Sequence, residues 1–160
     1  MAESDSLFST EERRTLSAVL DRLIPADDVP GAVASGGLEY VEYIFRKELA
    51  PELALFREAL RALDDAAVGR GHAGGFAALP PREQDDWLTS MERGRLNAVA
   101  PLLTPTFFER LLNLAAEGFY ADPDQGGNHG AVSWKMMGYD PRIPGRTTVE
   151  WASRRMKTQP

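Results

Sequence analysis

Apolar residues recur at helical spacing from the start of the chain. Between Ser9 and Pro25 they fall three and four positions apart, which places them on one face of a helix. Ser9 and Glu12 fit a capping box, in which each side chain accepts a hydrogen bond from the other's backbone, and Pro25 cannot continue a helix. This pattern predicts a first helix after Ser9, with the apolar stripe Leu16, Val19, Leu20 and Leu23.

The same spacing predicts four more helices. One follows Gly36-Gly37, which either precede the helix or admit a neighbouring backbone. The others begin at Pro51, at Pro80-Pro81 and at Thr104-Pro105, because proline is favoured in the first turn of a helix. No stretch alternates like a strand, so we expect an all-α fold of about five helices around one core. The assigned apolar positions are Leu38, Val41, Ile44, Phe45 and Leu49; Leu53, Phe56, Leu60 and Leu63; Trp87, Leu88 and Met91; and Phe108, Leu111, Leu112, Ala115 and Phe119.

The pattern changes after residue 121. Glycine and proline recur from Asp122 to Arg146, and neither helical nor strand spacing persists. Aromatic and methionine side chains nevertheless remain, which is untypical of disorder. We therefore divide one domain into a helical body, residues 1–121, and an ordered irregular tail, residues 122–160, packed on its own helices or on a partner.

Charge distinguishes these two parts. The 160 residues carry a net charge of −6. Residues 1–121 have 12 basic and 20 acidic side chains, whereas residues 122–160 have six basic and four acidic ones. The tail therefore suits either an acidic partner surface or the acidic body itself. An acidic chain is a poor ligand for nucleic acid, and no apolar run is long enough to span a membrane. The absence of cysteine excludes disulfides, thiolate metal sites and thiol catalysis.

Candidate catalytic residues are scarce. His72 lies in a glycine-rich loop where nothing local would fix its ring as a base. His129 lies in a tighter turn, where it is either satisfied by local backbone or bonds a partner or cofactor. Asp122 and Asp124 begin a calcium-loop pattern, but Ser133 stands where the loop needs a bidentate glutamate. We expect no catalytic, cofactor-binding or metal-binding residues in this chain.

The amino-terminal residues do not resemble an export signal. Residues 1–12 are acidic, and Asp21-Arg22 interrupts the apolar stretch that follows Arg13-Arg14. We expect the chain as written to stay in the cytoplasm, and to be periplasmic if a signal was trimmed or is carried by a partner.

Three segments together resemble the gluconate 2-dehydrogenase subunit 3 family. They are Leu23-Ile24-Pro25-Ala26-Asp27-Asp28-Val29-Pro30-Gly31-Ala32; Phe76-Ala77-Ala78-Leu79-Pro80-Pro81-Arg82-Glu83-Gln84; and Glu117-Gly118-Phe119-Tyr120-Ala121-Asp122-Pro123 through Gly126-Gly127-Asn128 to Trp134-Lys135-Met136-Met137-Gly138-Tyr139. The likeness spans about residues 16 to 141, and the long closing segment makes it specific.

The resemblance implies a small non-catalytic subunit of an FAD-dependent sugar or polyol dehydrogenase. The larger partner subunit would hold the FAD, a cytochrome subunit could complete the complex, and substrates would be glucose, gluconate or glucosides. Related small subunits are chaperone-like and often carry an export signal, which this sequence lacks. The alternative is an autonomous helical binder or enzyme that uses the loop around His129.

Under the first hypothesis the odd tail is the docking surface. Glycines let a backbone approach closely, and aromatic and methionine side chains are enriched at interfaces. The partner-binding residues expected are Gly126, Gly127, Asn128, His129, Trp134, Lys135, Met137, Gly138, Tyr139 and Trp151.

Overall fold

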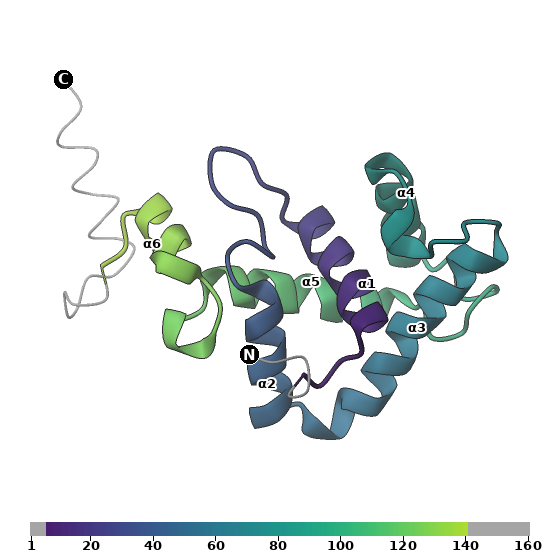
Figure 1. Cartoon of the computed structure of the whole chain (residues 1–160), viewed down its shortest axis with the longest axis horizontal. Coiled ribbons are helices and arrows are strands. Elements are labelled where there is room, and N and C mark those ends of the chain that lie inside the picture. Colours follow the sequence, from purple (N-terminus) through teal and green to yellow (C-terminus); the bar gives the residue numbers. More distant parts are fainter. Residues whose placement is uncertain (1–5, 141–160) are drawn as a thin grey trace.

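The computed structural model describes residues 6–140, and within this range helices are the only regular secondary structure (Figure 1). The all-α prediction is therefore confirmed. None of the helices described is long and apolar enough to cross a membrane. The α-helices are α1 Thr10–Leu23, α2 Gly37–Lys47, α3 Leu53–Gly69, α4 Pro81–Glu92, α5 Pro105–Tyr120 and α6 Val132–Met137, and the short 3₁₀ turns are η2 Ala50–Glu52, η3 Phe76–Ala78, η4 Pro123–Gln125 and η5 His129–Ala131.

Local sequence signals set most of the helix starts. Ser9 Oγ accepts a hydrogen bond from the Glu12 N–H at 3.2 Å, and Glu12 accepts one from the Ser9 N–H at 2.9 Å, so the predicted capping box forms. Thr104 caps α5 in the predicted way. The predicted start at Pro51 is wrong by two residues, because Pro51 lies in η2 and α3 begins at Leu53.

The core lies between α1 and the helices that surround it. In Figure 1 α5 runs behind α1 and α2, and it contacts α1, α2 and α4. One end of the core is a chain of aromatic rings, Phe8, Phe45, Phe56 and Phe107, with successive ring centroids 4.7 to 5.9 Å apart. Burial of rings in such contacts is a large part of the stability of a small helical domain.

Two buried glutamates connect neighbouring helices through ion pairs with partly exposed arginines. Glu12 on α1 accepts hydrogen bonds from Arg57 at 2.8 Å and Arg61 at 3.0 Å, both on α3. Glu42 on α2 pairs with Arg13 on α1 at 2.9 Å and with Arg46 at 3.1 Å. Arg13, the first residue of the Arg13-Arg14 pair, therefore belongs to helix α1 and connects it to α2.

The apolar stripe predicted for α5 is partly wrong. Phe107, Leu114 and Gly118 are buried, whereas Leu112, which was assigned to the core, is 41% exposed. The helix is apolar over more than one face, so its sequence alone does not select the buried side. The contacts with α1 and α2 decide it.

Candidate functional site

The segment after α5 contains more regular structure than its sequence predicts. It forms η4, η5 and the six-residue helix α6, rather than an irregular tail alone. The period is hidden because Asn128, Gly130 and Ala131 have left-handed backbones, with φ of 47°, 65° and 54°. Trp151 and the rest of residues 141–160 lie outside the described residues.

Glycines hold this segment close to the helical body. A Cβ on Gly127 would lie 2.2 Å from the carbonyl oxygen of Gly118 on α5, and a Cβ on Gly36 would lie 2.4 Å from that of Gly126. At Gly36-Gly37 the alternative of a close neighbouring backbone is the one found, and Gly126-Gly127, expected to let a partner's backbone approach, packs against this chain's own backbone. Gly36 also has a φ of +89° and precedes the first residue of α2, which places the start of that helix against the segment.

Asn128 connects the parts of the segment. Its side chain is completely buried and donates a hydrogen bond to Ala121 O at 3.0 Å. Its Oδ1 accepts from the Ser133 N–H at 2.9 Å and from the Ser133 hydroxyl at 2.8 Å, and its own N–H donates to Gly118 O at 3.0 Å. Asn128 thus fixes α6 to the end of α5.

His129 lies at the surface beside the connection between α1 and α2. Its N–H donates to Ser35 O at 2.9 Å, and its ring lies over Gly36, where a Cβ would come within 2.5 Å of Nε2. Among the residues that the structure describes, no three His, Asp or Glu side chains gather closely enough to bind a metal ion. The visible role of His129 is to join two loops.

The side chains of α6 are arranged opposite to those of an ordinary surface helix. The buried residue is Ser133, while Met136 is 49% and Met137 40% exposed. Trp134 is half-buried, and its ring meets Tyr139 edge to face, with centroids 5.1 Å apart. Its Nε1 donates to Tyr120 O at 3.1 Å. We call the apolar surface formed here the α6 face; it consists of Tyr120, Trp134, Met136, Met137 and Tyr139.

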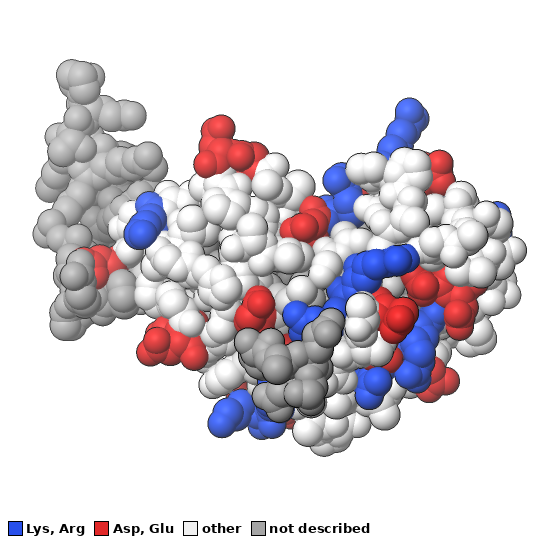
Figure 2. Space-filling view, viewed as in Figure 1, with Lys and Arg blue, Asp and Glu red and all other residues white. Residues whose placement is uncertain are grey.

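The charges around the α6 face are mainly acidic. Figure 2 shows charged side chains of both signs over α1 and α3. Glu117, Asp122 and Asp124 are exposed at the end of α5 and in η4, and Lys135 is the one exposed base of α6. The other five basic residues predicted to make the tail basic lie in residues 141–160, outside the described range.

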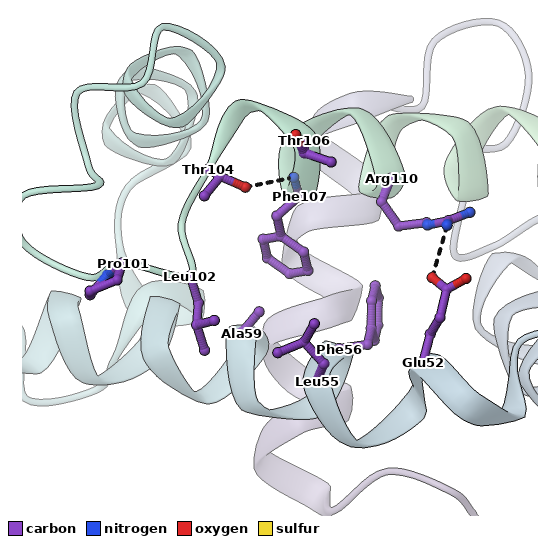
Figure 3. A pocket seen from close by; sticks show the side chains of 10 residues that line it. All are labelled: Glu52, Leu55, Phe56, Ala59, Pro101, Leu102, Thr104, Thr106, Phe107 and Arg110. Atoms are coloured by element: carbon purple, nitrogen blue, oxygen red, sulfur yellow. Dashed lines mark hydrogen bonds and ion pairs between the residues drawn. The ribbon is translucent and has the colours of Figure 1, made fainter.

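A second apolar surface is a groove between α3 and α5 (Figure 3). It has a volume of about 330 Å³, and Leu55 at its edge is 60% exposed. The charged groups at its end, Glu52 and Arg110, pair with each other at 2.8 Å, and the Thr104 hydroxyl caps α5. Glu52, Arg110 and Thr104 are therefore engaged with other groups, and apart from Thr106 the rest of the lining is apolar.

The phenol of Tyr40 on α2 is paired with a carboxylate of α5. Tyr40 donates to Glu117 at 3.1 Å, and burial of the phenol, with the Glu117 charge beside it, raises the pKa of Tyr40 to about 12. A tyrosine with that pKa stays protonated throughout the physiological range. His72 Nε2 lies 3.9 Å from a carboxylate oxygen of Glu83, and both side chains are partly exposed.

The comparison with known families places these features in context. Curated proteins and solved structures give no match to the chain. The family model for gluconate 2-dehydrogenase subunit 3 matches residues 10–141, which includes all six α-helices and the whole α6 face. The sequence resemblance is thereby confirmed over most of the chain. The protein belongs to the gluconate 2-dehydrogenase subunit 3 family, the subunits of a dehydrogenase complex.

Proposed function

We propose that this chain is the non-catalytic small subunit of an FAD-dependent sugar dehydrogenase of the glucose, gluconate or glucoside 3-dehydrogenase type. It stabilises the larger subunit in a chaperone-like manner, and the FAD belongs to that larger subunit. A cytochrome subunit is a further member of such a complex. The complex is exported where either chain carries a signal and is otherwise cytoplasmic.

The observation that carries this proposal is the orientation of α6. A surface helix of a monomeric protein packs its apolar side chains on the core and leaves its polar side chains in water. In α6 the buried residue is Ser133, while Met136 and Met137 are exposed, as is Tyr139 two residues after the helix. Exposed apolar patches mark protein interaction sites, and aromatic and methionine side chains are the types enriched there.

The rigidity of the α6 face also suits docking. Asn128 and Ser133 hold the helix by buried hydrogen bonds, and Trp134 is held by its bond to Tyr120 O. Side chains on such a fixed helix lose less conformational freedom on binding than side chains on a mobile loop. The apolar residues of the α6 face are therefore preorganised for binding a partner.

The test is co-expression with a larger FAD-containing dehydrogenase subunit, sought among the neighbouring reading frames. We expect the two full chains to co-purify with stoichiometric flavin, and the isolated small chain to be colourless and inactive on sugars. Tyr139→Ala should weaken the complex about thirtyfold, as loss of an aromatic anchor costs about 2 kcal/mol. Tyr139 is 50% exposed, so the variant should keep its helical circular dichroism.

The matched control is Leu55→Ala, because Leu55 is 60% exposed on α3, outside the α6 face. The affinity of the Leu55→Ala variant for the larger subunit should be unchanged. Stoichiometric flavin or sugar oxidation in the isolated small chain would refute the non-catalytic role. If Tyr139→Ala and Met136→Ala both bind as tightly as the parent, the docking site lies elsewhere.

A further inference from the structure

The α6 face has a charged margin that indicates what its partner surface carries. Exposed acidic residues occur on both sides of Tyr120 in the sequence: Glu117 one turn before it, and Asp122 and Asp124 just after it. Tyr120 itself accepts the Trp134 hydrogen bond, so this part of the chain adjoins the aromatic pair Trp134–Tyr139. An apolar centre therefore lies beside an acidic margin, with Lys135 as its one described base.

We infer that the α6 face binds a surface of the larger dehydrogenase subunit on which arginine side chains flank an apolar contact. This inference rests on the proposed function and specifies the partner chemistry of the same face. Arginine satisfies both features at once, because its guanidinium pairs with carboxylates and also stacks on aromatic rings. The exposed ring of Tyr139 offers a surface for stacking, and the exposed Glu117, Asp122 and Asp124 on either side of Tyr120 in the sequence offer carboxylates.

The local hydrogen bonds allow the charges to be removed without disturbing the structure. Asp122 Oδ1 accepts from the Asp124 N–H at 3.0 Å, and asparagine offers the same acceptor. Glu117 accepts from the Tyr40 hydroxyl, which glutamine can also do. The variant Glu117→Gln/Asp122→Asn/Asp124→Asn therefore removes three charges and keeps the caps.

The experiment measures the association rate of the purified flavoprotein with the full small chain by surface plasmon resonance. At about 0.05 M salt the triple variant should associate roughly tenfold more slowly than the parent, because opposite charges steer the encounter. At about 0.5 M salt the difference should disappear, since the charges are then screened. A matched control with three exposed acids of α3, α4 and α5 neutralised should associate like the parent; it is Glu58→Gln/Glu92→Gln/Glu109→Gln.

Three outcomes would overturn the inference. Unchanged association with a weakened Tyr139→Ala complex would show an apolar docking site without basic partners, and the proposed function would stand. Faster association of the triple variant would show that the chain's own residues 141–160, with five basic side chains against one acidic, cover the face. Concentration-dependent self-association of the parent, lost in Tyr139→Ala, would show that a second copy of this chain occupies it. If Tyr139→Ala also has no effect, the proposed docking site itself fails.

Discussion

Replacing Asn128 tests whether one buried amide holds α6 to the body. Asn128→Gly removes three side-chain hydrogen bonds, one donated to Ala121 O and two accepted from Ser133. At about 1 kcal/mol each, their loss should cost about 3 kcal/mol of unfolding free energy. Asn128→Ala should cost about 1 kcal/mol more, because alanine tolerates the φ of 47° less well than glycine.

Urea unfolding followed by circular dichroism measures this cost. With a slope of about 2 kcal/mol per molar urea, Asn128→Gly should lower the unfolding midpoint by about 1.5 M. Amide exchange should become faster in residues 132–137 at the same time. The control is Asn113→Ala on the exposed side of α5, which should leave the midpoint nearly unchanged. A shift below about 0.5 M in Asn128→Gly, or intact protection of α6, would refute this account of the junction.

Other perturbations test other contacts. Because the pKa of Tyr40 is raised to about 12, its contribution to stability should be complete below about pH 10 and be lost as the pH rises from 10 to 12. The melting temperature should therefore fall over this pH range. Tyr40→Phe should flatten the fall, and the control Tyr43→Phe should not. Gly127→Ala should destabilise the fold by about 2 kcal/mol in thermal unfolding, since the new Cβ would meet rigid backbone 2.2 Å away, and parent-like stability would refute that close approach. Glu12→Gln keeps the cap but loses the charge that binds two arginines, so about 2 kcal/mol should disappear; an effect that 1 M salt leaves unchanged would contradict the ion-pair explanation.

Local sequence signals alone determined the all-α class and most helix starts. The Ser9–Glu12 box and the Thr104-Pro105 start act through contacts three residues away, so they need no tertiary information. The family resemblance was likewise carried by contiguous segments. The stripe of α1 was readable because its opposite face is charged.

Tertiary contacts decided the rest. The buried side of α5 was set by α1 and α2, because its sequence is apolar on more than one face. Helix α6 was missed because three left-handed residues interrupt the period just before it. Met136 and Met137 of this helix also face outward, opposite to the rule by which sequence patterns are interpreted. The orientation of α6 depends on contacts that Asn128 and Gly127 make with the backbone of α5. The spacing of hydrophobic residues does not predict such contacts, because it describes only one helix at a time.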